Sequence, residues 1–115
     1  MNTTDLLNKL TIEQGVVEFS SVIDVIDSAY DFNPTEFTNG DLRNEAGQNN
    51  GSCKIFAFAK LHDLSEQQTL HCFGDYYRND VLCNPDAADH QNIRNFMATG
   101  WSGIQFNGSP LKVKK

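Results

Sequence analysis

The stretch Ile55–Leu61, with the sequence IFAFAKL, limits what this chain can fold into more than any other. It is apolar on nearly every side, so other elements must surround it. Its length suits either a buried strand or a central helix. Ala57, Ala59 and Lys60 are good helix formers, and Ser52 is a suitable N-cap. We therefore expect a helix at the centre of the core.

Apolar residues at three- and four-residue spacing predict further helices around this centre. Ser65, with Gln68 three residues later, is a capping box that starts one of them. Gly100 is expected to stop the last one, whose inward face is Ile93, Phe96 and Met97. The four expected helices cover residues 1–12, Ser20 or Ser21 to about Asp31, Ser65 to Asn84, and Asp86 or Asp89 to Gly100.

The expected β structure is small. Ile104–Phe106 alternates in the manner of a strand and is expected to pair with Thr35–Thr38 as a two-stranded ribbon. The polar segment Asn39–Gly51 is expected to be a long surface loop. The predicted fold class is mainly α, at the margin of α+β, with about five helices in a single domain over residues 1–108 and a loose basic tail over 109–115.

Composition excludes several classes of function. The chain has 115 residues, nine Lys and Arg, and a net charge of −6, which disfavours nucleic acid and anionic membranes as partners. Its three cysteines form no paired motif, which favours free thiols in the cytoplasm. We expect no metal and no cofactor, because metal-ligand spacings and nucleotide-binding loops are missing from the sequence.

Chemically capable side chains are concentrated at the start of the last helix, in Asp89, His90, Asn92 and Arg94. A helix N-terminus offers free N–H groups, and Arg94 could bind a carboxylate or phosphate. The simpler interpretation gives these side chains structural roles: Asp89 caps the helix, Arg94 pairs with a carboxylate, and His90 packs on an aromatic ring.

Cys53 is the candidate nucleophile. It follows an expected helix cap, where a helix dipole favours the thiolate, and His90 could act as its base. The alternative is a small buried core residue. These two residues are the only catalytic candidates that the sequence offers.

Five stretches together resemble one small family. They are YDFNPTEFTNG (30–40), NNGSCKIFAFAKL (49–61), LSEQQTLHCFGDYYR (64–78), DHQNIRNFM (89–97) and GWSGIQF (100–106). In this order they are similar to the HopJ family, named for a type III effector of plant-pathogenic bacteria. The resemblance implies one domain and no known catalytic residues, and it adds Trp101 to the binding candidates.

These observations favour a HopJ-like interaction or small-ligand-binding domain that is not an enzyme and whose partner is a protein or a small anion. The alternative is a small cysteine-nucleophile enzyme using Cys53 and His90. No classical secretory signal is visible, so we expect a cytoplasmic protein. The polar segment 1–12 could serve as a type III secretion signal, and a frayed terminus would have the same composition.

Overall fold

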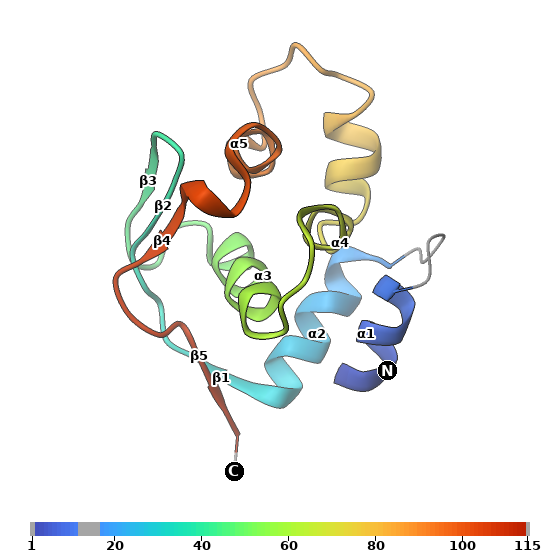
Figure 1. Cartoon of the computed structure of the whole chain (residues 1–115), viewed down its shortest axis with the longest axis vertical. Helices are drawn as coiled ribbons and strands as arrows, with labels where there is room; N and C mark the ends of the chain where they lie inside the picture. The colour runs from blue at the N-terminus through green and yellow to red at the C-terminus, as the bar shows by residue number, and fades with distance from the viewer. Residues whose placement is uncertain (1, 12–16, 115) are drawn as a thin grey trace.

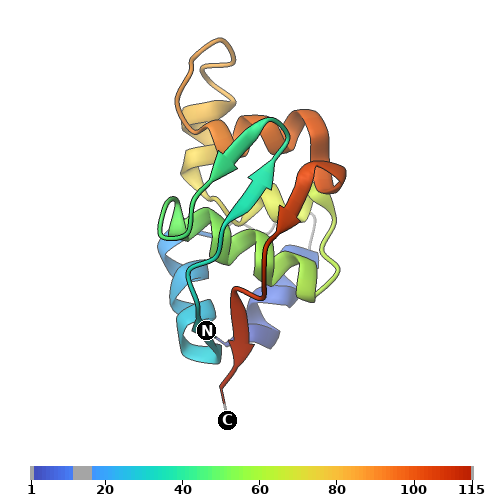
Figure 2. The ribbon, with the colours of Figure 1, turned by 90° about the vertical axis from the view of Figure 1, so that its left-hand side faces the viewer.

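The apolar stretch lies in α3 (Asn50–Leu61), which confirms the expected central helix. A computed structural model describes residues 2–11 and 17–114. In it, the strands lie on one side of α3 and the other helices surround its remaining sides (Figures 1 and 2). In the described part of the chain, no helix is long and apolar enough to cross a membrane.

Helices and short strands follow one another in groups along the chain. In order, the remaining elements are α1 (Thr3–Thr11), α2 (Phe19–Ala29), β1 (Tyr30–Phe32), β2 (Phe37–Asn39), β3 (Leu42–Asn44), α4 (Glu66–His71), the π-helical η1 (Tyr76–Val81), α5 (Gln91–Thr99), the 3-10 turn η2 (Gly100–Gly103), β4 (Ile104–Phe106) and β5 (Leu111–Val113). The fold is therefore α+β rather than mainly α.

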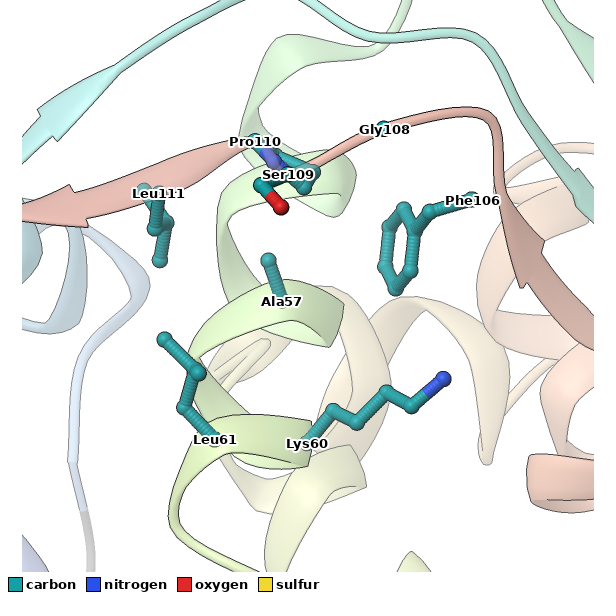
Figure 3. A pocket seen from close by; sticks show the side chains of 8 residues that line it. All are labelled: Ala57, Lys60, Leu61, Phe106, Gly108, Ser109, Pro110 and Leu111. Carbon is teal, nitrogen blue, oxygen red and sulfur yellow. The ribbon is translucent and has the colours of Figure 1, made fainter.

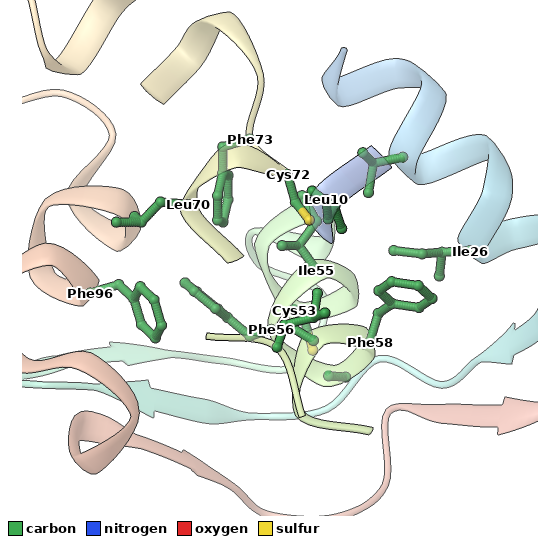
Figure 4. Packing of buried hydrophobic residues seen from close by; sticks show 14 of the residues in the cluster. Leu10, Ile26, Cys53, Ile55, Phe56, Phe58, Leu70, Cys72, Phe73 and Phe96 are labelled. Carbon is green, nitrogen blue, oxygen red and sulfur yellow. The ribbon is translucent and has the colours of Figure 1, made fainter. Parts of the chain in front are cut away.

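Phe56 joins α3 to elements on several sides of the core. Its side chain is fully buried, and its ring lies 5.0 Å from that of Phe96 and 5.4 Å from that of Phe73. Phe37 on β2 packs against it from the sheet, at 6.0 Å between ring centroids. These contacts hold α5, the turn after α4 and the sheet on one helix. Figure 4 shows the side chains of Phe56, Phe73 and Phe96.

The strands form two antiparallel sheets. The larger sheet has the order β3-β2-β4, and Phe37 pairs with Phe106 in it. The expected ribbon between residues 35–38 and 104–106 is thus real, although its first strand begins two residues later. The expected loop Asn39–Gly51 is wrong in its first half, because β3 turns back on β2 at Gly40 to make a hairpin.

The smaller sheet pairs β1 with β5, with Tyr30 opposite Val113. This pairing corrects two expectations. The segment 109–115 is not loose over β5, and α2 ends at Ala29 rather than near Asp31 because the chain enters β1 at Tyr30. The cap of α2 also differs from Ser20 or Ser21: the helix begins at Phe19, with Glu18 at the capping position.

The expected helix from Ser65 to Asn84 is broken. Ser65 and Gln68 form the predicted capping box, but α4 ends at His71. Gly74 follows with φ +60°, and a Cβ there would lie 2.6 Å from the backbone nitrogen of Phe19. Glycine is therefore needed for its left-handed backbone and for the close approach of α2, and the chain resumes in η1 with a new direction.

The close approach at Gly74 predicts an unusually large effect of a small substitution. Gly74→Ala adds both left-handed strain and a backbone clash, so we expect the free energy of unfolding to fall by about 3 kcal/mol or more. Gly47→Ala is the matched control, because Gly47 also has a positive φ but nothing lies within 4 Å of the added Cβ.

Chemical denaturation of both variants measures the difference. The control is expected to lose about 1 kcal/mol, from backbone strain alone. Equal losses for the two variants would show that the contact between Gly74 and α2 has no energetic weight.

Candidate functional site

His90 is the residue that precedes the first turn of α5, and its backbone angles are φ 51° and ψ 48°. This left-handed residue starts the helix without any side-chain cap, so the expected cap by Asp86 or Asp89 is wrong. α3 begins in the same way, because its capping residue Asn49 has the same backbone angles and no side-chain cap. Ser52, the expected cap of α3, lies instead in its first turn.

Arg94 is occupied by Asp89. Its guanidinium donates to Asp89 Oδ1 at 2.7 Å and to the Asp89 carbonyl at 2.6 Å. The hydrogen bond between the Arg94 guanidinium and the Asp89 carboxylate lowers the pKa of the Asp89 carboxyl. Arg94 also donates to the carbonyl of Pro85. The structural interpretation of this pair therefore agrees with the geometry, and Arg94 is not free to bind an anion by itself.

His90 lies between two carboxylates. Its Nε2 is 3.1 Å from Asp80 Oδ2 and 3.8 Å from Asp89 Oδ2. Its ring also lies 5.2 Å from that of Tyr76, so it does pack on an aromatic side chain. These contacts connect the start of α5 to η1 and fix where the imidazole lies.

Asn92 is the centre of a buried network of asparagines. Its Oδ1 accepts from Asn39 and from Asn44, each at 3.1 Å, and its Nδ2 donates to Asn44 Oδ1 at 2.9 Å. Asn39 also donates to the carbonyl of Asn92 at 2.7 Å, and Asn49 donates to Asn44 Oδ1. The network therefore binds the β2–β3 hairpin to the starts of both α5 and α3.

This network brings the two uncapped helix ends together at one hollow, which we call the His90 cleft. Its volume is about 300 Å³. The residues that give it its chemistry are Asn49, Ser52, Phe73, His90, Gln91 and Asn92. The backbone N–H groups of Ser52, Gln91 and Asn92 make no hydrogen bond with any described residue, as is usual for first-turn positions.

Trp101 lies apart from this cleft. Its indole Nε1 donates to the carbonyl of Leu64, and its backbone N–H donates to Glu66 Oε2, at 3.1 Å each. It borders a different hollow of about 240 Å³ together with Lys60 and Asp63. The structure thus unites His90 and Asn92 but separates Trp101 from them.

Among the described residues, Cys53 and His90 form no hydrogen bond with each other. It is buried in the core, and its Sγ lies 3.7 Å from the carbonyl of Thr35. Burial raises the pKa of its thiol to about 11, which keeps it protonated at neutral pH. The geometry therefore favours the core interpretation of Cys53 and gives the cysteine-nucleophile enzyme no support.

Sequence reasoning missed Asn39, Asn44, Asn49 and Gln91, and it gave Ser52 the wrong role. The available signal was the recurrence of asparagine in residues 39–50, although asparagine is also common in ordinary turns and loops. For metals, no group of three or more His, Cys, Asp or Glu gathers within residues 2–11 and 17–114.

The asparagine network makes Asn92 a stability determinant. Asn92→Ala removes three buried side-chain hydrogen bonds to Asn39 and Asn44 and keeps only the bond from Asn39 to the Asn92 carbonyl. We therefore expect a loss of about 2–4 kcal/mol in the free energy of unfolding. Gln91→Ala, at the exposed neighbouring position, serves as control and is expected to lose less than about 0.5 kcal/mol. A loss below about 1 kcal/mol in Asn92→Ala, measured by urea denaturation, would contradict the structural role of the network.

Thiol reactivity tests the role of Cys53. Cys83 is exposed, whereas Cys53 and Cys72 are buried with their thiol pKa raised to about 11 and about 12. At neutral pH we expect iodoacetamide to modify Cys83 first and the other two only after unfolding. Peptide mapping by mass spectrometry measures the order. Modification of Cys53 in the native protein as fast as a free thiol would revive the enzyme hypothesis.

Comparison with known proteins addresses the family and the fold of this chain. A search of curated proteins finds no match. A crystal structure of a protein of unknown function, VPA0580, is similar to this one with a TM-score of 0.96 and 52% identity, over 99% of this chain and 95% of that chain. The family model of the HopJ type III effector proteins matches residues 3–111. The resemblance seen in the sequence is thereby confirmed, and the chain belongs to the HopJ type III effector family.

Proposed function

We propose that this HopJ-family protein acts as a binding domain and that it holds a small anionic metabolite in the His90 cleft. The observation that carries the proposal is the convergence of two uncapped helix ends on one polar cleft. α3 and α5 each bring the positive end of a helix dipole there, and neither has an acidic residue in its first turn.

The groups available to a ligand are hydrogen-bond donors. The backbone N–H groups of Ser52, Gln91 and Asn92 have no described partner, and the Ser52 hydroxyl borders the same space. A carboxylate or phosphate would accept from these donors and complement both helix dipoles. A volume of about 300 Å³ suits a small metabolite rather than a nucleotide-sized cofactor.

The surrounding charges explain why such a site needs both helices. Asp80 and Asp89 lie beside His90 and would repel an anion. Arg94 offsets Asp89 through its ion pair at 2.7 Å. The protein carries a net charge of −6, so long-range attraction does not help the ligand. Binding must therefore come from short-range donors, and added salt should weaken it only modestly.

Residence in the cytoplasm belongs to the same proposal. All three cysteines are free thiols, which agrees with a reducing compartment. A role for the N-terminal segment in export would require α1 to unwind, because Leu6 and Leu10 of that helix are buried in the core. Those two contacts favour a structural role for α1.

The test is an NMR titration of the ¹⁵N-labelled protein with inorganic phosphate and with succinate. We expect saturable shifts at the backbone amides of Ser52, Gln91 and Asn92. Ser52→Asp places a carboxylate in the cleft, so it should prevent these shifts. The same carboxylate complements the helix dipoles, which should stabilise the protein by about 0.3–1 kcal/mol and raise Tm slightly. Ser102→Asp, at an exposed serine outside the cleft, is the matched control and should leave binding intact.

Two results would overturn the proposal. One is that neither anion shifts the three amides at millimolar concentration. The other is that Ser52→Asp binds as well as the parent protein, because the ligand would then lie elsewhere.

A further inference from the structure

A second hollow lies on another part of the surface, between the C-terminal half of α3 and the segment that joins β4 to β5. We call it the Lys60 groove and define it by Ala57, Lys60, Leu61, Phe106, Ser109 and Leu111. Its volume is about 300 Å³. Figure 3 shows Ala57 between Leu61 and Leu111 on one side and Phe106 on the other, with Ser109 above.

Lys60 gives the groove its charge. It is the one charged residue among those that line the groove, and it forms no ion pair with any described residue. Its Nζ lies 5.7 Å from the centroid of the Phe106 ring. An unpaired lysine beside apolar walls is complementary to a carboxylate that is attached to an apolar group.

The Ser109 hydroxyl adds a polar group on the opposite wall. It makes no hydrogen bond with any described residue, and its oxygen points into the groove in Figure 3. Lys60 also borders the hollow beside Trp101, which contains Asp63. Because Asp63 would repel a carboxylate, the ligand's charge is expected on the Phe106 side of Lys60.

The backbone of β4 forms an open edge beside the groove. β4 is an outer strand of the sheet. The N–H of Gly40 donates to the carbonyl of Gly103, and the N–H of Asn107 donates to the carbonyl of Glu36, so these are hydrogen-bonded residue pairs between β2 and β4. Because such pairs alternate along antiparallel strands, the N–H and C=O of Phe106 point away from β2. Both groups lack a partner among the described residues and can accept another extended chain.

We propose that the Lys60 groove binds the carboxyl-terminal residue of a partner polypeptide. The aliphatic side chain of that residue enters between Leu61 and Leu111 over Ala57. Its carboxylate accepts from Lys60 Nζ and Ser109 Oγ, and the preceding backbone runs along the open edge at Phe106. A carboxyl-terminal residue fits because its side chain and its carboxylate branch from the same Cα, so both reach one small groove.

This groove shares no residue with the His90 cleft. The inference is therefore independent of the proposed metabolite site, and either can fail without the other. It assigns this protein a partner of defined chemistry, an extended chain that ends in an aliphatic residue with a free carboxylate.

The experiment compares two pools of pentapeptides with mixed residues at the first four positions and leucine at the last. One pool has a free carboxylate and the other a terminal amide. In NMR titrations of the ¹⁵N-labelled protein, we expect the free-acid pool to shift the amides that line the groove, at Ala57, Lys60, Leu61, Phe106, Ser109 and Leu111. The amide pool and the variant Lys60→Gln should each bind about tenfold more weakly or worse.

Lys112→Gln is the matched control, because it removes one exposed lysine of β5 that does not line the groove. It should bind the free-acid pool as the parent protein does. Three results would overturn the proposal: no shift at the groove with the free-acid pool, equal binding of both pools, or unchanged binding in Lys60→Gln. Octanoate is added as a separate probe, and groove shifts with octanoate but not with peptides would show a small-carboxylate site instead.

Discussion

The burial of the middle of α3, Ile55–Ala59, is the constraint on which the rest of this structure depends. A helix whose faces carry Ile55, Phe56, Phe58 and Ala59, all fully buried, cannot lie at a surface. The chain must therefore cover it with strands on one side and helices on the others. Phe56 shows the consequence, since its ring contacts aromatic side chains from the sheet, from the turn after α4 and from α5.

The same constraint creates the His90 cleft. Covering α3 brings the start of α5 next to its own start, and the asparagine network fixes this arrangement. The side-chain amide of Asn92 forms hydrogen bonds with Asn39 and Asn44 of the hairpin. At this place buried hydrogen bonds hold the elements together, where apolar contacts do so in the rest of the core. Such a network specifies one geometry because a displaced partner leaves buried donors unsatisfied. The left-handed residues at the two helix starts, Asn49 and His90, are held by this packing rather than by side-chain caps.

The Lys60 groove arises from the opposite end of α3. The helix ends at Leu61, where the chain from β4 to β5 crosses it with small residues and a proline. That crossing leaves Leu61 exposed and Lys60 without a carboxylate partner among the described residues. The two ends of α3 thus differ in chemistry: backbone N–H groups without a described partner lie at its start, and apolar surface with one cation lies at its end.

Local signals in the sequence determined the elements whose causes lie within about four residues. The helix over Ile55–Leu61, the capping box of Ser65 with Gln68, and the stop at Gly100 all follow from such signals. Tertiary structure alone decided the rest: the break at Gly74 needs the backbone of Phe19, and the start of α5 at His90 needs the hairpin beneath it. Both proposed binding surfaces belong to this second group. Each surface joins residues that lie about 40 to 50 positions apart in the sequence. A pattern within one segment does not say which distant segment will lie beside it, because the packing around α3 decides that.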